Sequence, residues 1–179
     1  MFNFTDIKIK KCNVIKDGQK VCKKVNVNGI NVWRDGDLII PNPEQYPASA
    51  FVTSTNDTAS VRTLTVDNSN LFMAVSGNDD QWFQAKLTFP TNGRKWLNMT
   101  YSTTTSKDKL YRTWCEVRDV ENKKIATVID DLNVMSNVTD AVAKVYISGH
   151  TEVVIFIYLY VGKGRTRTFT ITNCELTDD

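Results

Sequence analysis

Residues 145–176 read VYISGHTEVVIFIYLYVGKGRTRTFTITNCEL, and this stretch decides the fold class. The ten residues from Glu152 to Val161 hold a single charge, at the first position, and the other nine are β-branched, aliphatic or aromatic. This composition is typical of a strand with a covered surface. Gly162 and Gly164 supply a turn, because glycine reaches positive φ without a steric penalty. We therefore expect one long antiparallel hairpin here.

The two faces of the expected hairpin differ in character. If Val161 lies opposite Arg165, the odd-numbered positions form a mostly aliphatic face that suits a core. The even-numbered positions set aromatic side chains beside threonines, which is unusually apolar for the solvated side of an antiparallel sheet. Another strand layer, another subunit or a ligand should cover them. Their aromatic members are Phe156, Tyr158 and Tyr160.

Composition narrows the class of protein. The chain has 179 residues and a formal net charge of +2, and no apolar run approaches the ~20 residues that span a bilayer. Its first five residues lack the features of a signal peptide, so we expect no membrane partner and no export by the general secretory route. With four cysteines, no CxxC pair and one histidine, the sequence predicts neither a metal site nor a cofactor.

Residues 1–41 are expected to form a basic β-meander, because Asp17-Gly18, Asn28-Gly29 and Asp35-Gly36 are strong hairpin signals. The segment carries eight basic and four acidic residues, a local charge of +4. Its only aromatic residue beyond Phe2 and Phe4 is Trp33, so it lacks the stacking residues of a nucleic-acid binder.

The register of the meander predicts a surface for a partner. A three-residue turn at 16–18 puts Ile9 opposite Val25 and Ile7 opposite Val27, and the next turn sets Val27 against Ile30 and Val25 against Val32. A small sheet with one apolar face needs either the main domain or another protein to cover that face, and we favour docking on a partner. The expected interface residues are Ile7, Ile9, Val25, Val27 and Trp33 together with the even-face aromatics Phe156, Tyr158 and Tyr160.

The same register sets Cys12 opposite Cys22. The two thiols form either a cross-strand disulfide, if their Cα atoms lie ~5.5 Å apart, or a pair of reduced cysteines that serve as small strand residues.

Three prolines between residues 41 and 47 predict a stiff linker over 42–49. From residue 50 to 179 short strand-like runs recur without a helical stripe, which favours an all-β fold, an antiparallel jelly-roll-like β-sandwich. The runs before the closing hairpin are 51–54, 61–66, 71–75, 81–89, 95–102, 110–120, 123–129 and 144–148.

On three of these strands the alternation separates a core face from a face that carries a tryptophan among amides, hydroxyls and charges. A flat indole can stack on the C–H face of a sugar ring while amides and charges bind its hydroxyls. Tryptophans also cap sandwich cores and anchor subunit interfaces, so both explanations stay open. The candidate glycan-binding residues are Trp82, Gln84, Lys86, Arg112, Trp114 and Glu116, with Trp96, Asn98 and Arg118 in the same set.

No catalytic motif is present in the sequence. His150 has no serine or cysteine motif to serve, and the carboxylate pairs Asp79-Asp80 and Asp130-Asp131 suit turns better than the separated pair of a glycosidase. We therefore expect a protein that is not an enzyme.

The segment from Val25 to Arg34 resembles the V-N-G-x-x-V-W-[KR] element near the start of small virion proteins of tailed phages. Residues 81–176 are similar in pattern to jelly-roll or galactose-binding-like modules of phage fibres, baseplates and capsid surfaces. The resemblance implies a structural protein of the virion, made in the host cytoplasm, that docks on other virion proteins, forms a homo-oligomer and touches host cell-surface polysaccharide. The alternative from another class is a free carbohydrate-binding module.

Overall fold

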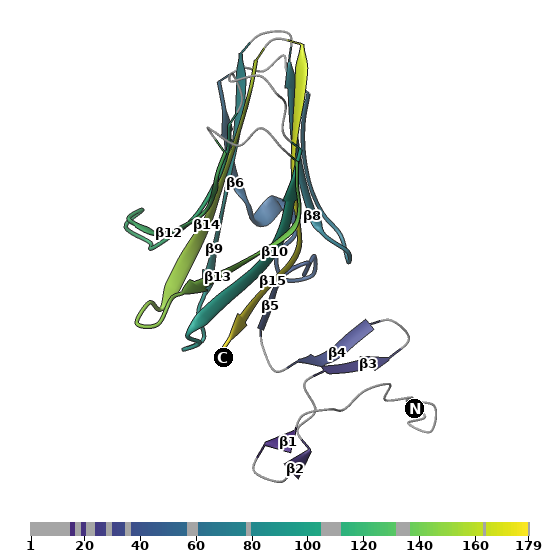
Figure 1. Ribbon diagram of the computed structural model, residues 1–179, viewed down its shortest axis with the longest axis vertical. Helices are drawn as coiled ribbons and strands as arrows, with labels where there is room; N and C mark the ends of the chain where they lie inside the picture. Colours follow the sequence, from purple (N-terminus) through teal and green to yellow (C-terminus); the bar gives the residue numbers. More distant parts are fainter. Residues whose placement is uncertain are drawn as a thin grey trace. The chain divides into compact units, whose positions relative to one another are not determined.

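The computed structural model describes residues 15–16, 19–20, 24–27, 30–34, 37–56, 61–77, 80–104, 112–131, 137–162 and 164–178. Contacts within the chain divide it into two compact units, residues 1–37 and 38–179. The larger unit is a sandwich of two antiparallel sheets that face one another (Figure 1). No helix in the described part of the chain is long and apolar enough to cross a membrane.

The six-stranded sheet has the order β13-β10-β15-β8-β7, and β5 also pairs with β15. The five-stranded sheet has the order β12-β11-β14-β9-β6. This arrangement confirms the predicted all-β, jelly-roll-like sandwich. Its elements are β5 (Asp37–Ile40), the 3₁₀ helix η2 (Ala48–Ala50), β6 (Val52–Thr55), β7 (Val61–Val66), β8 (Leu71–Gly77), β9 (Gln81–Pro90), β10 (Trp96–Thr103), β11 (Arg112–Arg118), β12 (Lys124–Asp130), β13 (Val138–Tyr146), β14 (Glu152–Val161) and β15 (Arg165–Thr177).

The predicted hairpin between β14 and β15 is wrong, because the two strands lie in different sheets. β14 pairs with β9 and β11, whereas β15 pairs with β8 and β10. The odd-numbered side chains of β14 from Val153 to Val161 and those of β15 from Arg167 to Ile171 point inward, and Ile157 and Phe169 are fully buried from opposite sheets. Beyond an irregularity in the β10–β15 pairing the inward positions of β15 become Cys174 and Leu176. The even-numbered aromatics and threonines therefore lie on opposite outer surfaces of the sandwich and form no common ladder.

The core faces predicted for the middle strands are confirmed. On β9 and β10 alternate residues are at most 8% exposed, as the alternation of apolar and polar residues requires. On β11, Thr113, Cys115 and Val117 are completely buried. Cys115 and Cys174 are both free thiols in this core, and burial raises their pKa well above the ordinary value.

One buried polar cluster joins the two sheets. Arg167 on β15 forms an ion pair with Asp131, which follows β12, and both side chains are at most 2% exposed. Arg167 Nε also donates to Thr113 Oγ1 on β11 at 2.6 Å, and the Asp131 carboxylate accepts the Thr113 backbone N–H. Thr113 Oγ1 lies 3.0 Å from Thr103 Oγ1 on β10. A charged side chain, Arg167, therefore lies on the inward face of β15, which the sequence predicted to be mostly aliphatic.

The strands before residue 37 are short and pair locally. β1 (Ile15–Lys16) pairs with β2 (Gln19–Lys20), and β3 (Lys24–Val27) pairs with β4 (Ile30–Arg34). Ile15 lies opposite Lys20, so the first turn has two residues and the predicted three-residue turn is wrong.

The β3–β4 register agrees with the sequence prediction only next to its turn. Val27 pairs with Ile30 as predicted, but a bulge after Val25 places that residue opposite Trp33 and not Val32. Ile7, Ile9, Cys12 and Cys22 lie outside the described residues.

The third predicted hairpin, at Asp35-Gly36, does not form. β5 joins the large sheet through β15, and Ile39 and Ile40 are buried in the sandwich core. In the segment predicted as a linker, Tyr46 is 7% exposed and packs edge-on against Phe89, with ring centroids 6.3 Å apart. The contacts therefore place residues 38–49 with the sandwich, because their apolar side chains complete its core.

Candidate functional site

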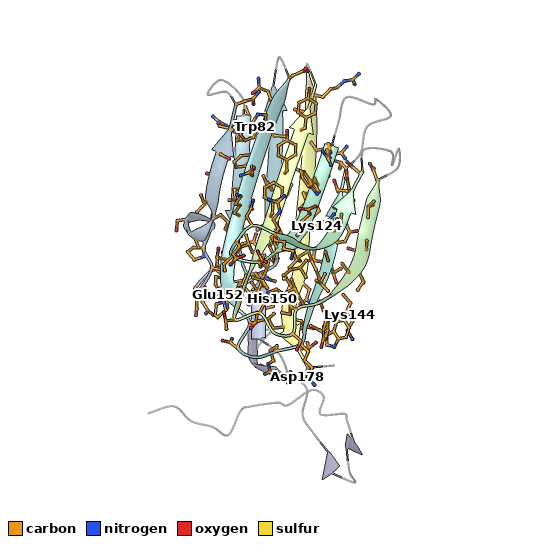
Figure 2. The ribbon with its side chains drawn as sticks, turned by 90° about the vertical axis from the view of Figure 1, so that its left-hand side faces the viewer. Trp82, Lys124, Lys144, His150, Glu152 and Asp178 are labelled. Atoms are coloured by element: carbon orange, nitrogen blue, oxygen red, sulfur yellow. The ribbon has the colours of Figure 1, made fainter. Side chains whose placement is uncertain are left out.

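The outer surface of the five-stranded sheet brings together most of the side chains that the sequence singled out. Figure 2 views the molecule from this side, with Trp82 toward one end of the sheet. Pairing of β9, β14 and β11 sets their outward residues in rows: Trp82, Tyr160 and Arg112; then Gln84, Tyr158 and Trp114; then Lys86, Phe156 and Glu116. We call these nine residues and Arg118, which ends β11, the aromatic face.

Two rings of the aromatic face form a stacked pair. Trp82 and Tyr158 have ring centroids 6.0 Å apart and an interplanar angle of 25°. Trp114 meets Tyr158 and Phe156 edge-on, at 6.4 and 5.4 Å. These offset and edge-to-face contacts are the arrangements that aromatic quadrupoles favour. They hold the four rings in fixed orientations along the middle of the sheet.

Guanidinium groups cover part of the rings. Arg118 Cζ lies 3.9 Å from the centroid of Phe156 and 5.4 Å from that of Trp114, and Arg112 Cζ lies 4.3 Å from that of Trp114. Phe156 is only 4% exposed as a result. Among the described residues no cation stacks on Trp82, so its indole is the more available platform.

Carboxylates hold the two arginines in place. Arg112 forms a two-pronged ion pair with Asp130 on β12, at 3.1 Å from Nε and 2.8 Å from Nη2. Arg118 uses Nε and Nη2 to bind Glu116 Oε2, each at 2.8 Å. Glu116 is 3% exposed, so it positions Arg118 and has little surface for a ligand.

The two tyrosines of the face stay protonated well above neutral pH. Burial raises the pKa of Tyr158, although the nearby Arg112 charge opposes the rise. Burial also raises the pKa of Tyr160, and a hydrogen bond to the Asp80 carboxylate acts in the same direction. Both phenols can therefore donate and accept hydrogen bonds.

All six predicted ligand residues lie on this face, but the structure gives them different surroundings. Trp82, Gln84 and Lys86 form one outward line along β9, whereas Trp114 and Glu116 are engaged by the arginines. The face also holds Phe156, Tyr158 and Tyr160, which the sequence assigned to a partner interface. Phe156 cannot serve that purpose as it stands, because side chains of its own sheet cover it.

Trp96 and Asn98 belong to a different surface. Both are on β10, in the six-stranded sheet, where Trp96 pairs with Tyr146 at a ring distance of 4.8 Å. Lys144 Nζ lies 4.7 Å from the Trp96 ring centroid. The sequence therefore grouped three tryptophans that the fold separates onto two opposite sheets.

Sequence reasoning missed the contribution of Asp130. It was expected only as a turn residue, but it ends β12 opposite Trp114 and fixes Arg112 over that ring. The alternation along β12 gave no signal for this, because register shifts interrupt its pairing with β11. Among the described residues no group of three or more His, Cys, Asp or Glu could hold a metal ion.

No protein-family model matches the sequence, and no curated protein matches it. Solved structures do match the fold. TmCBM61, solved in complex with beta-1,4-galactotriose, matches at a TM-score of 0.50 and 11% identity, over 78% of this chain and 95% of that one. A carbohydrate-binding module of the β-sandwich superfamily matches at 0.44 and 14%, over 87% and 75%. The bacteriophage CBA120 tailspike protein 4 matches at 0.47 and 10%, over 80% of this chain and 21% of that one.

Proposed function

We propose that the chain is a non-enzymatic glycan-binding protein and that the aromatic face is its binding site. The observation that carries this proposal is the Trp82–Tyr158 stack beside Gln84 on an outward strand surface. The C–H face of a pyranose would lie on the Trp82 indole. The Gln84 amide and the Tyr158 and Tyr160 hydroxyls would bind its hydroxyl groups. The likeness in fold to TmCBM61, solved with a galactotriose, supports this proposal.

The Trp82 platform has a direct test by substitution. Trp82→Ala should weaken glycan binding by about 2 kcal/mol, the loss typical of a hot-spot residue, or roughly 30-fold in Kd. A glycan array would identify the ligand, and calorimetry with that ligand would measure the loss. Trp96→Ala provides the matched control, because it removes an indole that also contacts a tyrosine ring, but from the opposite sheet.

Three results would contradict the proposal. Unchanged binding by Trp82→Ala would exclude the indole as the platform. An equal loss in Trp96→Ala would place the site on the other sheet. Absence of any bound glycan on the array would contradict the proposed glycan-binding function itself.

We further propose that this binding protein is a structural component of a phage virion, in a capsid, tail or fibre, and contacts the polysaccharide of the host surface. The resemblance of residues 25–34 to the virion-protein element supports this. The separate unit of residues 1–37 supports it as well, as a part that would attach the sandwich to a larger particle. Mass spectrometry of purified particles tests the proposal. Recovery of the chain from the particles is expected, whereas its presence only in the unassembled fraction favours a free carbohydrate-binding module.

A further inference from the structure

The charged side chains of the aromatic face are unevenly paired. Three cations lie there, Lys86, Arg112 and Arg118, with the carboxylates of Asp130 and Glu116, while the Asp80 carboxylate is hydrogen-bonded to Tyr160 at the Trp82 end. Asp130 binds Nε and Nη2 of Arg112, and Glu116 binds Nε and Nη2 of Arg118, so each arginine already has a carboxylate partner. Lys86 is left without an ion-pair partner among the described residues.

The neighbours of Lys86 in the sheet are uncharged, and the one charged group that shares a ring with it is the Arg118 guanidinium, which also contacts Phe156 and is already paired with Glu116. In the sheet it lies between Phe156 of β14 and Val52 of β6, and Gln84 and Thr88 flank it along β9 on the same side. Its Nζ lies 5.6 Å from the Phe156 ring centroid, in a cation–π contact that leaves the positive charge uncompensated. Glu116 is two strands away in the same row, ~9–10 Å at the usual strand spacing, and is already bound to Arg118.

The distance from Lys86 to the indole platform exceeds one sugar ring. Trp82 and Lys86 are four positions apart on one strand, about 13 Å at the usual rise per residue. A glycan stacked on Trp82 and running along β9 would meet Gln84 next and Lys86 last. Lys86 would therefore contact a different sugar unit, or a substituent of one.

We propose that the ligand is an acidic glycan, with a neutral ring on Trp82 and a carboxylate or phosphate group bound by Lys86. The inference rests on the proposed glycan-binding function and specifies its substrate class. Among the described residues of this face, Lys86 is the one cation without an ion-pair partner, so its ammonium group is available to a charged ligand. A carboxylate or a phosphate would satisfy it equally well by charge.

The test compares acidic polysaccharides with neutral forms of the same chains. Polygalacturonate, alginate and hyaluronan would each be presented beside their carboxyl-reduced forms, with poly(glycerol phosphate) as the phosphate source and β-1,4-galactan as a neutral reference. Wild-type protein is expected to bind at least one acidic polymer ~10-fold or more tightly than its neutral form, and to lose that preference in high salt because exposed charges are screened. Carboxylate polymers and poly(glycerol phosphate) distinguish the two sources of negative charge.

Substitution of lysines identifies the cation responsible. Lys86→Gln should bind the acidic and neutral forms alike, and Lys86→Arg should retain the preference. Lys144→Gln is the matched control, because it removes the same charge from a lysine that also lies over an aromatic ring, on the opposite sheet. It should behave as wild type.

The outcomes separate this inference from the function on which it rests. Suppose that the protein binds neutral polymers, that Trp82→Ala abolishes this binding and that Lys86→Gln leaves it unchanged. This result would contradict the proposal of an acidic ligand but would support the glycan-binding function. Acidic preference lost equally in Lys144→Gln would also contradict the proposed acidic ligand. Failure of every polymer to bind would contradict both the glycan-binding function and the acidic ligand.

Discussion

At the scale of single residues, the adjacent carboxylates Asp130 and Asp131 offer a direct comparison. Asp131 is buried with Arg167, and removal of one partner of such a pair leaves an uncompensated charge that costs about 3–5 kcal/mol. Asp130 pairs with Arg112 at a partly exposed site, where an ion pair contributes only about 0–1 kcal/mol. Asp131→Asn should therefore lower the free energy of unfolding by several times as much as Asp130→Asn, measured by urea denaturation.

The two substitutions are closely matched controls for one another, since each changes the same carboxylate to the same amide. Equal and small losses would show that the Arg167–Asp131 pair contributes little beyond an exposed pair. A large loss in Asp130→Asn would instead assign the main stabilising role to the arginine that lies over Trp114.

At the scale of elements, the position of β14 between two neighbours has a measurable consequence. β14 pairs over its length with β9 and along most of it with β11, so its amides are hydrogen-bonded on both sides of the strand. β6 has four residues and lies at the edge of the same sheet, paired with β9 alone. Amides of β14 should exchange with solvent only on global unfolding, whereas β6 should exchange through local opening.

Hydrogen exchange followed by mass spectrometry, with peptides covering residues 52–55 and 152–161, measures the difference. Similar rates in the two peptides would contradict the central position of β14.

The same strands show how much of the fold could be predicted from the sequence. The inward faces of β9, β10 and β11 follow from a period of two, which is a local property of any strand with one covered side. Neighbours in a sheet are not a local property. Ile157 and Phe169 point into one core whether their strands form a hairpin or face each other across the sandwich, so alternation cannot separate the two cases.

For the candidate site, too, the sequence predicted which side chains point outward but not which strands lie side by side. Alternation placed Trp82, Gln84 and Lys86 on one outward line of β9, and it did the same for Trp114 on β11. The placement of arginines over Trp114 depends on Asp130, which comes from a strand with an irregular register, and no pattern in the sequence indicates it. The separation of Trp96 onto the other sheet likewise depends on strand order.

At the scale of the whole molecule, the described surface of residues 38–179 shows little sign of a self-assembly interface. Its exposed large apolar side chains are scattered over edge strands and a turn, and single exposed apolar residues are normal on a soluble surface. The aromatic face, which the sequence predicted would need an external cover, is partly covered by its own arginines. The exposed residues are Val52, Val61, Val120, Val142 and Tyr146.

If the chain forms the homo-oligomer proposed for a virion component, residues 1–37 should therefore be required. Light scattering over a dilution series should give a mass above the monomer for the full chain and a monomer for residues 38–179, which hold the complete core of the sandwich. Circular dichroism of the shorter chain would verify that it keeps its strands. A monomer in both cases would exclude self-assembly and leave attachment to another protein. An oligomer of residues 38–179 would instead place the interface on the sandwich, because that fragment lacks the N-terminal unit.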